Sequence, residues 1–310
     1  MPQALRFVFL NERGLRAGWR LIIFLVIFLS LSFVLILPLT ASARRQAGTG
    51  MLAPGPQIVG EAVAFFGLLL ASWIMSRIER RPMGEYGLPL KTANVFRRLV
   101  SGYVFWGFLA ISVCLLALHL VGAFDFGGLA LHGAPVWIYG VQWLVAALLV
   151  GLTEEYLLRG YALYTLADGI GFWPATIVLG VLFGLGHAPN PGETRIGVIA
   201  TVVFALFASL TLRLTGNLWL AVGAHAGWDW GQSFFYGVSD SGLTAEGHLL
   251  NPSFHGPVWL TGGSVGPEGS AVALILLIAM MLLFYLVYRK RKQPVLIMEP
   301  GTVPPGAAGL

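Results

Sequence analysis

The chain has 310 residues, of which 57% are hydrophobic and 11% are charged. An ordinary soluble domain carries roughly 25% charged residues, so this composition excludes a soluble globular protein and indicates a membrane protein. The net charge of +5 predicts no nucleic-acid partner, because the basic residues flank the apolar segments, where retention of cytoplasmic loops requires them. Cys114 is the only cysteine, which excludes an intrachain disulfide.

Eight apolar stretches recur along the chain, each close to the roughly 20 residues that a helix needs to cross about 30 Å of hydrocarbon. They are continuous and do not alternate with polar residues, which favours helices over a β-barrel. We therefore predict an all-α fold, a polytopic bundle of about eight transmembrane helices in contact with the lipid bilayer. The predicted spans are residues 21–38, 57–76, 99–122, 136–157, 172–188, 196–213, 217–237 and 271–288.

The basic residues predict the orientation, since Lys and Arg are retained on the cytoplasmic side. They are dense before the first predicted span, between the second and third spans, and after the last span. The alternate loops contain only Arg44, Arg45 and Arg195. Both termini are therefore predicted to be cytoplasmic, in a multi-pass integral membrane protein that a bacterium would hold in its plasma membrane.

Three regions differ in content. Residues 1–98 supply two spans and a basic cytoplasmic loop, and residues 99–236 form a core in which the motif region 136–236 carries ionisable residues at membrane depth. Residues 237–310 supply an external loop, the last span and a tail predicted to be disordered. A charge at the bilayer centre costs at least about 2.5 to 3.5 kcal/mol, so we expect the chemistry in the core.

The fourth predicted span contains two adjacent carboxylates and an arginine. Glu155 and Arg159 are four residues apart, so they can pair on one helix face as a structural tie. Glu154 points about 100° away from Glu155 and is the freer carboxylate.

Two further spans carry imidazoles. His187 ends the fifth span, with Phe183 one turn before it on the same face, and His225 and Asp229 lie four residues apart in the seventh span. By contrast, other ionisable residues show no partner in the sequence and are assigned to interfaces or loops: Glu61, His119, His132, His248 and His255.

Counting residues predicts that some of these side chains meet. If the fourth and fifth spans form an antiparallel hairpin that turns near residues 169–171, Glu154 and His187 lie at nearly the same level. His225 joins them only if this hairpin projects about 10 Å further towards the cytoplasm than the hairpin of the sixth and seventh spans.

The patterns Glu-Glu-x-x-x-Arg at 154–159, Phe-x-x-x-His at 183–187 and His-x-x-x-Asp at 225–229 occur in this order on three predicted transmembrane helices. Together they resemble the signature of the CPBP family of intramembrane endopeptidases, also described as CAAX prenyl protease 2-like or ABI proteins. The family's third motif ends in Asn or Asp, so Asp229 fits it. The resemblance covers residues 136–236.

This resemblance implies a membrane endopeptidase that hydrolyses peptide bonds of a membrane-associated or C-terminal peptide substrate. Glu154 would activate a water also held by His187, and His225 with Asp229 would stabilise the oxyanion. Similar proteins trim prenylated C-termini or take part in bacteriocin maturation or immunity, and the sequence does not choose among these roles or specify an oligomeric state. The implied catalytic residues are Glu154, His187, His225 and Asp229, with Glu155, Arg159 and Phe183 in support.

The same four catalytic side chains are also potential ligands of a divalent metal such as zinc, which would make the enzyme a metalloprotease. The sequence has no His-Glu-x-x-His helix, so we favour a glutamate-type mechanism without a cofactor. Two other function classes stay open. Ionisable residues between helices also build secondary transporters, although we find no internal repeat, and the same fold could serve as a catalytically silent membrane scaffold.

Overall fold

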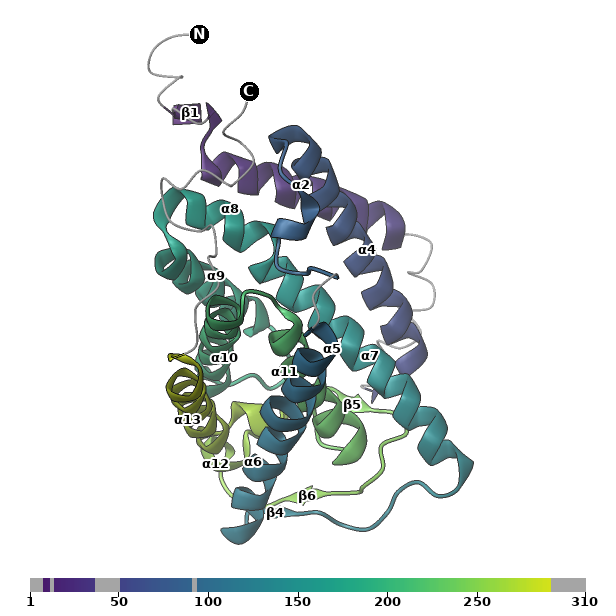
Figure 1. The fold of residues 1–310 in the computed structure, drawn as a ribbon. Helices are drawn as coiled ribbons and strands as arrows, with labels where there is room; N and C mark the ends of the chain where they lie inside the picture. Colours follow the sequence, from purple (N-terminus) through teal and green to yellow (C-terminus); the bar gives the residue numbers. More distant parts are fainter. Residues whose placement is uncertain (1–7, 12–13, 37–50, 91–93, 291–310) are drawn as a thin grey trace.

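The computed structural model describes residues 8–11, 14–36, 51–90 and 94–290, and these form a bundle of helices joined by loops (Figure 1). In this part of the chain, six helices are long and apolar enough to cross a membrane. The predicted all-α, multi-pass membrane architecture is therefore confirmed. The predicted tail disorder falls largely on residues 291–310, which lie outside the described residues, and the cytoplasmic placement of the termini stays a prediction.

Most of the helices follow the predicted apolar segments with small shifts at their ends. The helices are α2 (Ala17–Ile36), α4 (Pro54–Glu79), α5 (Val95–Ser101), the π-helical η3 (Gly102–Phe108), α6 (Leu109–Leu120), α7 (Ala134–Arg159), α8 (Tyr161–Ile170), α9 (Phe172–His187), α10 (Arg195–Thr215), α11 (Trp219–Trp230), the π-helical η4 (Gly231–Phe235), α12 (Val258–Thr261) and α13 (Ala271–Tyr288). Helix α8 and the short α12 match no predicted span. Short 3-10 turns, η2 (Met83–Glu85) and η5 (Pro267–Gly269), lie in loops.

Two predicted spans form shorter helices than the others. The fifth span is α9, and the seventh is α11 continued by η4. These two helices carry His187, His225 and Asp229, so three of the four predicted catalytic residues lie on the shorter helices of the bundle.

The connection between α7 and α9 differs from the predicted hairpin. The turn at Gly171 is present, with φ +85°, but the chain also breaks at Gly160, where α7 ends and the separate helix α8 begins. A Cβ atom at Gly160 would overlap the carbonyl oxygen of Tyr156, so this position requires glycine. Because the helix does not run straight from Glu154 to the turn, equal residue counts do not place Glu154 and His187 at one level, and the premise of that count is wrong.

Glycines let α11 pack closely against its neighbours. On one side, a Cβ atom at Gly223 or Gly227 would overlap the carbonyl oxygen of Leu99 or Tyr103, in α5 and η3. This small-residue spacing of four is typical of close helix contacts in membranes. On the other side, a Cβ atom at Gly151 of α7 would lie 2.9 Å from the carbonyl oxygen of Val222. Helix α11 is thereby fixed between η3 and α7.

The loop after η4 is held to the bundle by short strands. Strand β5 (Thr244–Ala245) pairs in parallel with β3 (Met51–Leu52), and β6 (Ser253–Phe254) pairs antiparallel with β4 (Phe124–Asp125). A further strand pair joins β1 (Leu10–Asn11) to β2 (Gly14–Leu15). The indole of Trp143 on α7 also donates a hydrogen bond to the carbonyl of Glu246 at 2.8 Å. The loop therefore lies against the open end of the helices and closes one side of a cavity.

Candidate active site

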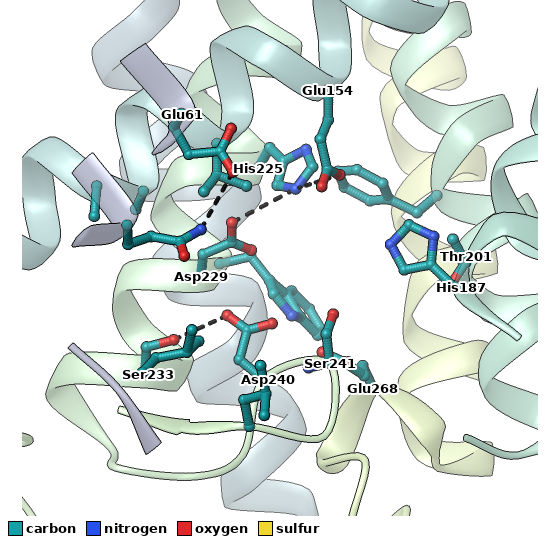
Figure 2. Close-up of a pocket in the computed structure, with 18 of the residues that line it drawn as sticks. Glu61, Glu154, His187, Thr201, His225, Asp229, Ser233, Asp240, Ser241 and Glu268 are labelled. Carbon is teal, nitrogen blue, oxygen red and sulfur yellow. Dashed lines mark hydrogen bonds and ion pairs between the residues drawn. The ribbon is translucent and has the colours of Figure 1, made fainter. Parts of the chain in front are cut away.

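A cavity of about 250 Å³ lies among α4, α7, α9, α10 and α11, with the loop after η4 forming one wall. All four predicted catalytic residues line it, and Figure 2 shows their side chains directed towards one another. The structure thus brings Glu154, His187, His225 and Asp229 together from three helices. Apolar side chains complete the wall: Trp143, Phe183, Phe204 and Trp228.

The two adjacent glutamates of α7 face different surroundings. The Glu155 side chain is fully buried and accepts a hydrogen bond from Nη1 of Arg159 at 2.9 Å, the pairing that their spacing predicts. Arg159 is also buried and reaches the hydroxyl of Ser209 on α10 at 3.4 Å. The Glu154 side chain is 30% exposed and lines the cavity. Glu154 is therefore the carboxylate that water and a substrate can reach.

His225 is oriented by Glu155. Its Nδ1 lies 2.9 Å from Oε1 of Glu155, and because a carboxylate oxygen only accepts, Nδ1 carries the donated proton. Its Nε2 faces the cavity, 3.6 Å from Oε2 of Glu154 and 3.5 Å from Oδ2 of Asp229. The Phe204 ring packs edge-on against the imidazole at 5.1 Å between centroids. Glu155 thus connects Arg159 to His225, a contact between two motifs that their spacing does not reveal.

His187 is held through Phe183. Its Nδ1 lies 2.9 Å from the carbonyl oxygen of Phe183, which only accepts, so Nδ1 donates and Nε2 has its lone pair free for the cavity. The Phe183 ring contacts the imidazole at 4.4 Å between centroids, and the Arg159 guanidinium lies 5.7 Å from that ring. The three residues expected to support the site therefore form a continuous set of contacts behind the two histidines.

Three carboxyl groups that the sequence analysis did not assign to the site also line the cavity: Glu61 on α4, and Asp240 and Glu268 in the loops beyond η4 (Figure 2). The prediction that Glu61 is an interfacial or loop residue without a partner is wrong. Glu61 lines the cavity, and its Oε1 accepts a hydrogen bond from Gln57 at 3.3 Å. The spacing of Gln57 and Glu61, one helical turn inside an apolar span, was the available signal for this residue. Isolated acids in a loop rich in Gly and Ser give no such signal.

The two loop carboxyls are held by donors. Asp240 accepts a hydrogen bond from Ser233 at 2.9 Å, while Glu268 accepts hydrogen bonds from Gln232 at 2.6 Å and from the backbone N–H of Ser241 at 2.8 Å. Burial raises the pKa of Asp240, and burial together with the charge of Asp240 raises the pKa of Glu268 well above its usual range. These two carboxyls attach the loop to η4, at the wall of the cavity that the loop forms.

The residues do not fit a metal centre as they are arranged. Within the described residues, no group of three or more His, Cys, Asp or Glu side chains is disposed to hold a metal ion. The metalloprotease alternative gains no support from this arrangement, and we derive no step through a metal.

A comparison with protein families matches residues 135–231 to the type II CAAX prenyl endopeptidase Rce1-like family. The matched segment runs from the start of α7 to the start of η4 and contains all three motifs. It confirms the resemblance to the CPBP and CAAX protease family and supports a CAAX-type membrane endopeptidase at family level. No curated protein and no solved structure matches the chain.

Proposed function

We propose that this protein is an intramembrane endopeptidase in which Glu154 and His187 activate a water molecule to attack a peptide bond. One observation carries the proposal most strongly: a partly exposed carboxylate and two oriented imidazoles, from three helices of a segment that matches a peptidase family, line a single cavity. Placing a base, a second water ligand and an oxyanion donor in one cavity is what hydrolysis of an unreactive amide requires.

Water activation is assigned to Glu154 and His187. The Glu154 carboxylate takes one proton from the water, while Nε2 of His187 accepts a hydrogen bond from the O–H that remains, because its Nδ1 already donates to the Phe183 carbonyl. The resulting hydroxide adds to the scissile carbonyl carbon. General base catalysis of this kind contributes typically 10² to 10⁴ in rate, so loss of Glu154 is expected to be severe.

Oxyanion stabilisation is assigned to His225. When the carbonyl oxygen becomes an oxyanion, His225 in its imidazolium form donates a hydrogen bond to it from Nε2–H, while Nδ1–H stays bonded to Glu155 and keeps the ring in place. Asp229, 3.5 Å from Nε2, supports the imidazole from the same helix. The carbon–nitrogen bond then breaks, and the leaving nitrogen must receive one proton. Glu154 has taken one proton from the water, so the reaction neither gains nor loses a proton overall.

The substrate proposed is a peptide segment in or at the membrane. The matched family is described by its action on CAAX prenyl substrates, so a C-terminal peptide of a membrane-associated protein is the first class to test. The aromatic walls of the cavity suit an apolar side chain or lipid group next to the cleaved bond, since such pockets bind mainly by apolar contact.

The test uses purified protein in liposomes and a fluorogenic peptide library. We expect wild-type protein to cleave members of the library, and Glu154→Gln and His187→Ala to lose at least about 100-fold in kcat/KM. Glu85→Gln is the matched control, because Glu85 lies outside the cavity, in a partly exposed 3.6 Å ion pair with Arg81, distant in sequence from the motifs. Full cleavage by Glu154→Gln would overturn the proposal, and solute uptake without any cleavage would favour a transporter.

A further inference from the structure

Glu61 is a carboxyl group in the cavity that the mechanism above does not use. It projects from the membrane helix α4, which packs along α7, and the Thr153 hydroxyl of α7 donates to its main-chain carbonyl at 3.3 Å. An ionisable side chain at membrane depth is costly and is retained where it has a role. The ionisable groups that face Glu61 are Glu154 on α7 and His225 and Asp229 on α11 (Figure 2).

The other carboxyl groups of the cavity already have defined partners. Glu154 and Asp229 both face Nε2 of His225, and the loop carboxyls accept hydrogen bonds from η4 and the loop backbone. The hydrogen-bond donors around the Glu61 carboxyl in the described residues are neutral: the Gln57 amide donates to Oε1 at 3.3 Å, and the Thr153 hydroxyl also lies within reach of the carboxyl. A carboxyl group with neutral hydrogen-bond donors can keep a proton on Oε2 and present it to a substrate.

The position of Glu61 indicates which side of the scissile bond it faces. In Figure 2, Glu61 and His187 lie on opposite sides of His225, and the Glu154 carboxylate lies between His225 and His187. If the attacking water is held by Glu154 and His187 and the oxyanion by His225, the side of the scissile carbon away from the water faces Glu61. In a tetrahedral intermediate, that side carries the leaving nitrogen.

We propose that Glu61 is a further catalytic residue, the general acid that protonates the leaving nitrogen. This inference rests on the proposed peptidase function. The proton on Oε2 of Glu61 passes to the nitrogen as the carbon–nitrogen bond breaks, giving the free amine and the Glu61 carboxylate. The proton that Glu154 took from water then returns to Glu61 through water in the cavity, so the cycle neither gains nor loses a proton.

The test compares two substrates that differ only in the leaving atom. One is a fluorogenic peptide that wild-type protein cleaves, and the other is its thioester analogue, in which sulfur replaces the scissile N–H. A thiol has a pKa of about 8.5, so a thiolate departs without a proton donor, whereas an amine cannot. Glu61→Gln keeps an oxygen that accepts from Gln57 but removes the transferable proton. We expect it to lower kcat on the amide at least about 100-fold and on the thioester less than about threefold.

The variants separate this role from a structural one. Glu61→Asp keeps the acid and should recover part of the amide cleavage, while Glu85→Gln should leave both rates unchanged. If Glu61→Gln lowers kcat equally on the amide and the thioester, or on neither, the assignment of Glu61 is overturned while the peptidase proposal stays intact. Undiminished amide cleavage by Glu154→Gln would overturn the peptidase proposal and this inference with it.

Discussion

Glu154 and Glu155 are neighbours in the chain with opposite tasks. Successive side chains on an α-helix point about 100° apart around its axis. The Glu154 carboxylate therefore faces the cavity, while the Glu155 carboxylate is buried against Arg159 and His225. The sequence is sufficient to predict which of the two is freer. It does not reveal that Glu155 reaches His225, because that contact depends on how closely α11 approaches α7 at Gly151.

The buried pair gives a prediction at the level of single residues. Arg159→Met should reduce the free energy of unfolding by about 3 to 5 kcal/mol, because it leaves the fully buried Glu155 carboxylate without its cation. Glu155→Gln in the same protein should recover part of that stability. Peptidase activity should not recover, because His225 would no longer face a carboxylate at Nδ1. Thermal unfolding and peptide cleavage of the single and double variants measure both effects.

The ion pair of Arg81 and Glu85 supplies the control. It is partly exposed and its atoms lie 3.6 Å apart, so Glu85→Gln should change the free energy of unfolding little compared with Arg159→Met. An Arg159→Met protein as stable as wild type, or a double variant as active as wild type, would contradict the structural role assigned to this pair.

Helix α11 shows how packing at the level of elements sets the site. Its glycines Gly223 and Gly227 face η3 and α5, while His225 between them points towards α7. The same helix therefore uses one face for close packing and the other for chemistry. Any side chain that pushes α11 away from η3 also moves His225 relative to Glu154.

Gly227→Ala tests this packing. The added methyl overlaps the Tyr103 carbonyl, and overpacking of this kind costs about 1 to 3 kcal/mol, so the thermal midpoint should fall and cleavage should weaken. Gly60→Ala on α4 makes the same change where nothing lies within 4 Å, and its midpoint should stay level or rise. Equal midpoints for the two variants would show that the contact does not hold the helices.

The loop after η4 is the element whose role the sequence does not predict. Its Gly, Ser and Pro content indicates a loop, but the carboxyls that attach it to the cavity, Asp240 and Glu268, follow no helical or strand spacing. Its place over the site depends on contacts between distant segments, such as the pairing of β3 with β5 and the hydrogen bond from Trp143 to Glu246.

These loop carboxyls predict a pH dependence of stability. Their pKa values are raised in the folded protein, so the folded state binds more protons than the unfolded state once pH exceeds about 4, and stability falls as pH rises through the raised values. Asp240→Asn removes one titrating group and the charge that raises the pKa of Glu268. The decrease in thermal midpoint between pH 5 and pH 8 should therefore be smaller in Asp240→Asn than in wild type. An equal or larger decrease would contradict the assignment.

For the whole molecule, the apolar segments and the three motifs are enough to predict a multi-pass helical bundle with a site between α7, α9 and α11. In the described part of the chain, each of the eight apolar segments forms helix over most of its length, because hydrocarbon leaves backbone groups no other partner. The break at Gly160 could not be predicted, since it depends on a close contact with Tyr156. Glu61 was not assigned to the site because its hydrogen-bond partner on α4 is the neutral Gln57. Glu61 comes to line the same cavity as Glu154 only when α4 and α7 pack together.

The predicted orientation can be tested because Cys114 is buried and is the only cysteine. Gly84 and Gly128 are exposed glycines with open space around them, in loops predicted to lie on opposite sides of the membrane. We expect a membrane-impermeant maleimide to label Gly128→Cys in intact cells and Gly84→Cys only after permeabilisation. The reverse pattern would place the termini outside the cytoplasm.

The central claim is that water activated at Glu154 hydrolyses a peptide bond inside this cavity, and isotope incorporation measures it most directly. Wild-type and Glu154→Gln proteins in liposomes are incubated with a cleavable peptide in ¹⁸O-labelled water, and the products are weighed by mass spectrometry. We predict one labelled oxygen in the new carboxylate with wild-type protein and no product above background with Glu154→Gln. Labelled product formed at the same rate by both proteins would contradict the account.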